Sequence, residues 1–110
     1  MRYVYSIKQI DEKLPDAELY LFSNWNETER LGGFRRDLYV MTDSGFIESK
    51  YGSHRALEEL FCEYNTNQRQ RVNMMHNFAV SDVVVITYMN GGQEVVEEWF
   101  CDAVGFHKLT

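Results

Sequence analysis

The chain has 110 residues, the size of one ordinary domain, and 45% of them are apolar. Its 11 basic and 17 acidic side chains give a net charge of −6, which opposes nonspecific attraction to nucleic acid or anionic lipid. Charges occupy the N-terminal region where a signal peptide needs an apolar stretch, and no apolar run approaches the ~20 residues that cross a bilayer. We therefore expect one domain over residues 1–110, located in the cytoplasm, with no membrane partner.

In the N-terminal half, alternating apolar and polar residues predict a first strand over about residues 2–10. A short helix is expected at about 26–31, because asparagines precede it, glutamates occupy its first turn and two glycines follow it. Residues 37–42 are rich in strand formers. The Asp-Ser-Gly triplet at 43–45 then predicts a tight turn.

In the C-terminal half, apolar residues at helical spacing predict the main helix at about 54–65. Two β-rich segments, 80–89 and 93–101, flank Asn-Gly-Gly and predict a C-terminal β-hairpin. Residues 83–86 lack alternation, as in a strand covered on both faces. The predicted fold is an α+β domain, in which a four- or five-stranded antiparallel or mixed sheet packs against the main helix and a short helix lies near 26–31.

The sequence holds no grouping typical of a metal, cofactor or catalytic site. Zinc sites bring their ligands in close pairs, and a cysteine nucleophile needs a basic partner and an environment that lowers its pKa. The glycine pairs lack the spacing and the lysine of a phosphate-binding loop. We therefore expect no cofactor, no metal and no catalytic role for the isolated histidines and cysteines, which are His54, Cys62, His76, Cys101 and His107.

Acidic side chains gather in the second half of the chain, where residues 56–110 hold eight acids and three bases. Glu94, Glu97 and Glu98 belong to the predicted hairpin and suggest an acidic surface that would bind a protein partner. Neighbours on a strand point to opposite faces, so Glu97 and Glu98 cannot share a proton as a general acid/base pair does. An exposed edge protected by charge is the simpler interpretation of this pair.

Two segments carry a resemblance to a known family. The segments His76-Asn77-Phe78-Ala79-Val80-Ser81-Asp82-Val83-Val84-Val85-Ile86 and Phe100-Cys101-Asp102-Ala103-Val104-Gly105-Phe106 resemble the YodL-like family of small bacterial proteins. The family pattern has leucine in place of Phe78 and serine in place of Ala103. The resemblance implies a protein or module of Firmicutes and their mobile elements, and it supplies no activity. It nominates as motif positions His76, Ser81, Asp82, Asp102 and Gly105.

Three functional hypotheses follow. The first is a non-enzymatic module of a conjugative element or phage that binds a protein partner, whose identity is unknown, through the acidic hairpin. The second is a nucleic-acid-binding accessory protein that uses its two arginine clusters, Arg35 with Arg36 and Arg69 with Arg71. The third is a small enzyme, which requires His76 and Asp82 to converge in a pocket.

Overall fold

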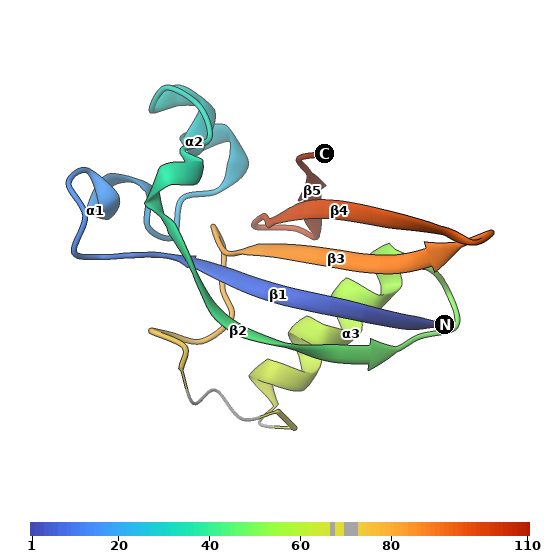
Figure 1. Cartoon of the computed structure of the whole chain (residues 1–110). Helices are drawn as coiled ribbons and strands as arrows, with labels where there is room; N and C mark the ends of the chain where they lie inside the picture. The colour runs from blue at the N-terminus through green and yellow to red at the C-terminus, as the bar shows by residue number, and fades with distance from the viewer. Residues whose placement is uncertain (67, 70–72) are drawn as a thin grey trace.

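The computed structural model describes residues 1–66, 68–69 and 73–110 and has the predicted α+β architecture (Figure 1). Five strands form one sheet in the order β2-β1-β3-β4-β5, and every neighbouring pair is antiparallel. None of the helices in the described ranges is long and apolar enough to cross a membrane. In chain order the elements are β1 (Arg2–Ile10), α1 (Ala17–Tyr20), α2 (Trp25–Arg30), the 3₁₀ helix η1 (Arg36–Leu38), β2 (Tyr39–Glu48), α3 (Ser53–Asn65), β3 (Val83–Asn90), β4 (Gln93–Cys101) and β5 (Phe106–Lys108).

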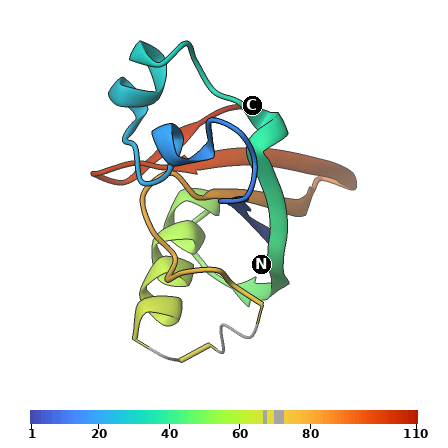
Figure 2. The same ribbon diagram turned by 90° about the vertical axis from the view of Figure 1, so that its left-hand side faces the viewer.

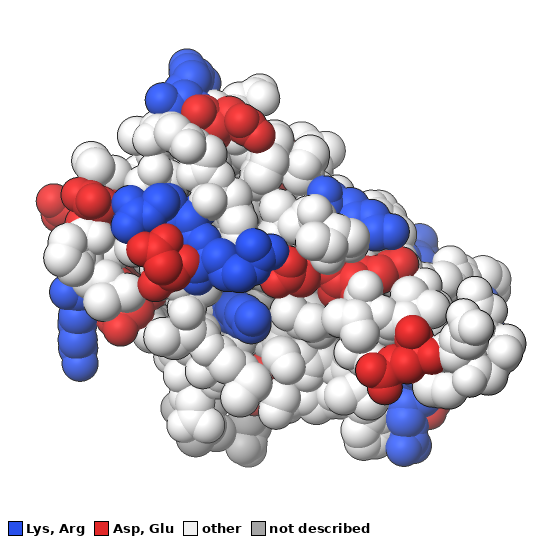
Figure 3. Space-filling model, turned by 45° about the horizontal axis from the view of Figure 1, so that its top comes forward, with Lys and Arg blue, Asp and Glu red and all other residues white. Residues whose placement is uncertain are grey.

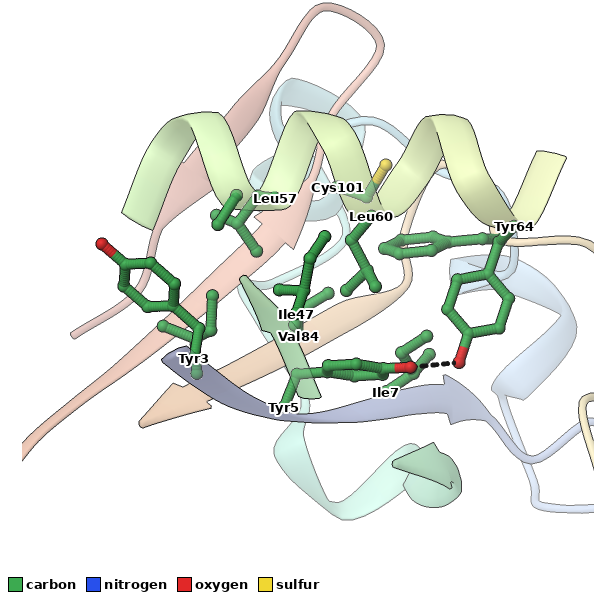
Figure 4. Close-up of a cluster of buried hydrophobic side chains, with 12 residues drawn as sticks. Tyr3, Tyr5, Ile7, Ile47, Leu57, Leu60, Tyr64, Val84 and Cys101 are labelled. Atoms are coloured by element: carbon green, nitrogen blue, oxygen red, sulfur yellow. Dashed lines mark hydrogen bonds between the residues drawn. The ribbon is translucent and has the colours of Figure 1, made fainter. Parts of the chain in front are cut away.

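The main helix α3 covers one face of the sheet and confirms the helix predicted at about 54–65. Figure 4 shows Leu57, Leu60 and Tyr64 directed from this helix toward the strands. Burial of each leucine stabilises the fold by about 2 kcal/mol. The buried hydroxyl of Tyr64 lies 2.8 Å from that of Tyr5 and donates to Asp43 at 2.7 Å, so its polar atom is satisfied inside the core.

The tight turn predicted at residues 43–45 is wrong, because this segment continues strand β2. Thr42 forms a β-bulge, because Met41 and Asp43 on either side of it pair with Lys8 and Ile7, which are consecutive residues of β1. Gly45 pairs with Tyr5, and a Cβ atom at Gly45 would lie 2.7 Å from the Tyr5 hydroxyl oxygen. The glycine therefore serves the close packing of a buried tyrosine.

A smaller layer formed by α1, α2 and η1 lies on the side of the sheet opposite α3 (Figure 2). Ile10, Ala17, Tyr20 and Leu38 form its own buried cluster. Helix α2 spans Trp25–Arg30, close to the predicted 26–31, and begins with a capping box between Asn24 and Glu27. This layer reaches one end of the sheet only, and no other helix of the described residues covers the rest of that face (Figure 1).

Candidate functional site

Four of the five motif positions meet at one end of the sheet, where β3 begins and β4 ends. The Ser81 amide donates to the Cys101 carbonyl at 2.9 Å, and the Cys101 amide donates to the Asp82 carbonyl at 2.8 Å. These bonds hold the loop before β3 against the end of β4. We call this polar cluster the junction, and its members are Gln9, His76, Ser81, Asp82 and Asp102.

Asp82 is the buried centre of the junction. Its side chain has no exposed surface, and its Oδ2 accepts hydrogen bonds from Gln9 Nε2 at 3.0 Å and from the Ala79 amide at 2.9 Å. Gln9 is equally buried and accepts from the Met75 amide at 2.9 Å. The carboxylate and the carboxamide together fix the path of the loop that leads into β3.

His76 lies against the other oxygen of the same carboxyl group. Its Nε2 is 3.6 Å from Asp82 Oδ1, and neither of these buried atoms has a hydrogen-bond partner among the residues that the structure describes. The His76 carbonyl accepts from Gln9 Nε2 at 3.1 Å, and the Phe22 ring packs edge-on to the imidazole at 4.8 Å. The histidine and the aspartate, six positions apart in sequence, are thus brought together as the enzymatic hypothesis requires.

Burial raises the pKa of Asp82 to about 7, because the charged carboxylate loses its hydration. The hydrogen bonds from Gln9 and Ala79 and the nearby His76 oppose this rise. The negative charge of Asp82 in turn adds to the effect of burial on Cys101, whose pKa is raised to about 12. A neutral thiol at neutral pH is the opposite of what nucleophilic catalysis needs.

The remaining motif positions fasten the α1–α2 layer to the sheet or shape a turn. Ser81 has a left-handed backbone (φ +81°), and its Oγ accepts from the Phe22 amide at 3.0 Å. Asp102 Oδ1 accepts from the Trp25 amide at 3.0 Å. Gly105 adopts φ +70°, which favours glycine, and its carbonyl accepts from the Asp102 amide at 3.0 Å.

The geometry does not make the histidine–aspartate pair a catalytic centre. Asp82 is completely enclosed, and the His76 side chain is 14% exposed beneath the Phe22 ring. A cavity of about 550 Å³ exists, but it lies between α3 and the turn after β4, and neither residue lines it. In the part of the chain that the structure describes, no three His, Cys, Asp or Glu side chains are grouped to hold a metal ion.

The three hairpin glutamates do not form one acidic surface. Glu97 lies on the α3 side of the sheet, is buried, and accepts from Tyr88 Oη at 3.0 Å and Trp99 Nε1 at 3.1 Å, with Lys108 Nζ 3.5 Å away. Glu98 points to the opposite face and pairs with Arg36. Of the three, only Glu94 is exposed to solvent. On the face that Figure 3 shows, acidic and basic side chains lie next to one another.

The arginines nominated for nucleic-acid binding are likewise engaged with carboxylates. Arg35 pairs with Asp37 at 2.8 Å, and Arg36 pairs with Glu98, both on the α1–α2 side of the sheet. Arg69 follows α3 on the other side, pairs with Glu63 at 2.7 Å and donates to the Tyr5 hydroxyl at 3.0 Å. Arg71 lies outside the described residues. Arg69 therefore lies on the opposite side of the sheet from Arg35 and Arg36, and each of the three is paired with a carboxylate.

Sequence reasoning missed a row of side chains on the bare part of the sheet. Val4 pairs with Phe46 on one side and with Thr87 on the other, and Thr87 pairs with Val96, so the four residues form one line across β2, β1, β3 and β4. Val4, Phe46 and Val96 are 53%, 50% and 53% exposed. We call these four residues the open-face row. The available signal was Val4, an apolar residue between Arg2 and Ser6 on the more polar face of the first strand.

Comparison with known proteins places the chain in a family. No curated protein and no solved structure matches it. The model of the YodL-like domain matches residues 4–110, which include the junction and all the helices and strands described above except the first two residues of β1. The chain therefore belongs to the YodL-like domain family.

Proposed function

We propose that this protein is a non-enzymatic interaction domain that binds a protein partner through the open-face row. We place it in the cytoplasm, within a protein assembly of a bacterial mobile element. The observation that carries the proposal is the row itself, in which Val4, Phe46 and Val96 expose about half of their surface in one line across the sheet. Single exposed apolar residues are ordinary, whereas an aligned group is typical of an interaction site.

The shape of the row favours an amphipathic helix as the bound element. Four adjacent strands are about 14 Å across from first to last, and a helix of about ten residues has that length. The opposite face of this same sheet is already covered by a helix, α3. A partner helix on the bare half would complete a three-layer arrangement that buries apolar surface on both faces.

The charges around the row add a requirement for the partner. Arg2 and Glu48 form an ion pair at 3.1 Å beside Phe46, with the Arg2 guanidinium 4.2 Å from the centre of that ring. On the hairpin side, Glu94 is exposed next to Met89. A bound helix would therefore carry an apolar stripe flanked by both acidic and basic residues.

Photo-crosslinking in the native host tests the proposal. Thr87, at the centre of the row, is replaced by p-benzoylphenylalanine, and Leu19, which is 58% exposed on α1, receives the same replacement as the matched control. We expect position 87 to give one discrete crosslinked protein, joined through a helical peptide identified by mass spectrometry. Position 19 should not give this product.

The double variant Val4→Thr, Val96→Thr provides the decisive comparison, because threonine keeps the β-branched shape and removes the apolar surface. We expect it to lower the yield of the position 87 crosslink at least fivefold, and Leu19→Gln to leave the yield unchanged. Equal yields from the double variant and the wild type would overturn the proposal. The absence of any product at position 87 would overturn it as well.

A further inference from the structure

A second surface of the molecule, separate from the open-face row, is hollowed between α3 and the turn that follows β4. The cavity there has a volume of about 550 Å³ and is lined by every residue from 101 to 106 together with one side of the helix. Its α3 wall is formed by His54, Glu58 and Phe61. This cavity lies on the α3 side of the sheet, and the open-face row lies on the other side.

The walls of the cavity are aromatic. The Phe61 and Phe106 rings lie 6.4 Å apart, and His54 packs edge-on to Phe106 at 6.5 Å and to Trp99 at 5.6 Å. Cys101 lines it with a buried thiol whose pKa is raised to about 12, so this residue adds no charge at neutral pH. Aromatic faces attract cations through their quadrupoles, and more strongly where water is partly excluded.

The charges at the cavity are all negative. Among the described residues that line it, Glu58 and Asp102 are charged and none is a lysine or arginine. Two bases next to lining residues in sequence or on β5 are paired elsewhere, Arg55 with Glu59 at 3.6 Å and Lys108 with Glu97 at 3.5 Å. Among the described residues, Glu58 is held only by His54 Nδ1 at 3.1 Å, so its carboxylate is available to a cation.

The wall opposite the helix is held in place before any ligand binds. Asp102 Oδ1 accepts from the Ala103 amide at 2.8 Å and from Trp25 of the α1–α2 layer, while the Asp102 amide closes the turn onto the Gly105 carbonyl. Val104 stands at the rim and is 93% exposed. A preformed site loses little ordering entropy on binding.

We propose that this cavity binds the cationic side chain of a lysine or arginine from a partner protein. The alkyl stem of such a side chain would pack against Val104 and Phe106, and its charge would reach the Glu58 carboxylate between the rings of His54 and Phe61. The aromatic walls select a long apolar stem, and the negative charge selects a cation at its end. This inference goes beyond the proposed function, because it concerns a different surface and a different chemistry.

The test is an NMR titration of the ¹⁵N-labelled full chain with three capped amino acids. N-acetyl-lysine methylamide is the probe, its norleucine counterpart has the same stem without the charge, and its glutamate counterpart has the opposite charge. We expect saturable shifts of the amides around His54, Glu58 and residues 103–106 with the lysine probe. The norleucine probe should bind at least fivefold more weakly, and the glutamate probe should not bind.

Two variants and one control locate the site. Glu58→Gln should weaken the lysine probe about tenfold, as expected for loss of one partly desolvated ion pair and its support of the cation–π contacts. Ala103→Phe, at an exposed lining position, should block the cavity, and Glu94→Gln should change nothing. The proposal is overturned if norleucine binds as well as lysine, if Glu94→Gln acts like Glu58→Gln, or if no amide around the cavity shifts. Val4→Thr, Val96→Thr should leave this binding intact, so either proposal can fail without the other.

Discussion

At the junction, the buried polar side chains of Gln9 and Asp82 are hydrogen-bonded to each other, whereas the open-face row presents apolar side chains to solvent. Asp82 and Gln9 have no exposed surface, yet Val4 and Val96 on the same sheet are more than half exposed. Buried polar groups with hydrogen bonds of this kind contribute to the fold itself. Aligned exposed apolar groups are typical of a surface that a partner covers. The contrast separates residues that hold the fold from residues available for binding.

The largest expected loss of stability comes from a substitution in the junction. Asp82→Ala removes the hydrogen bonds that Asp82 accepts from Gln9 Nε2 and from the Ala79 amide, and Gln9 Nε2 keeps its bond to the His76 carbonyl. Two such losses lower the free energy of unfolding by about 4 kcal/mol. Chemical denaturation of the variant and the wild type measures the difference. A change under about 1 kcal/mol would mean that Asp82 does not hold the junction.

The second prediction concerns pH and the same carboxyl group. Its pKa is raised from 3.8 to about 7 by folding, so the folded state binds the proton more tightly than the unfolded chain. The stability that this group contributes is complete below pH 3.8 and is lost as the pH rises through about 7. Relative to Asp82→Asn, which cannot titrate, the wild type should lose about 3 kcal/mol of stability between pH 4 and pH 7.

Charged and titratable neighbours of Asp82 set the control for this measurement. His76 faces it at 3.6 Å, and Tyr39 and Cys101 interact with its charge. Burial raises the pKa values of this tyrosine and this thiol, so neither group titrates between pH 4 and pH 7. His76 is therefore the neighbour to remove. Repeating the comparison in a His76→Gln background should retain the slope, and a flat difference in both backgrounds would show that the carboxyl group does not titrate in this window.

The third prediction separates two glutamates of the same hairpin. Glu97→Ala leaves Tyr88 Oη and Trp99 Nε1 without their acceptor and should destabilise the fold by about 2 kcal/mol. Glu94→Ala, at an exposed position, should change stability by less than about 0.5 kcal/mol. Thermal unfolding of the two variants side by side checks this difference. Equal losses of stability from the two variants would mean that Glu97 and Glu94 belong to one exposed surface, and would contradict the prediction.

The smallest expected change in stability comes from substitutions in the open-face row. Val4→Thr, Val96→Thr changes side chains that are more than half exposed and keeps their strand preference, so stability should change by less than about 0.5 kcal/mol. The same denaturation assay measures it. A loss above about 2 kcal/mol would show that these valines hold the fold and are not reserved for a partner.

Much of the fold was predictable because its signals are local. The first strand, the main helix and the hairpin each carry a period of two or 3.6 residues, or a turn dipeptide, within one short window. The Asp-Ser-Gly segment misled for the opposite reason, since its local preference is a turn while its glycine is required by Tyr5, some forty positions away. Tertiary packing outweighed the local preference.

The candidate sites were less predictable than the fold. The bond between Gln9 and Asp82 spans 73 positions, and no spacing rule connects them. Alternation indicated that Glu97 and Glu98 face opposite ways, but it could not reveal Lys108 and Arg36 as their partners. The open-face row depends on strand register, which sets Val4 between Phe46 and Thr87.

The crosslink yield from position 87 in three backgrounds tests the central distinction most directly. We predict that Val4→Thr, Val96→Thr lowers the yield of the crosslinked partner at least fivefold, while His76→Gln, a change in the junction, lowers the yield only as far as it lowers the folded fraction. The opposite pattern, a crosslink that survives the double change and disappears in folded His76→Gln, would make the junction the binding site and contradict the account.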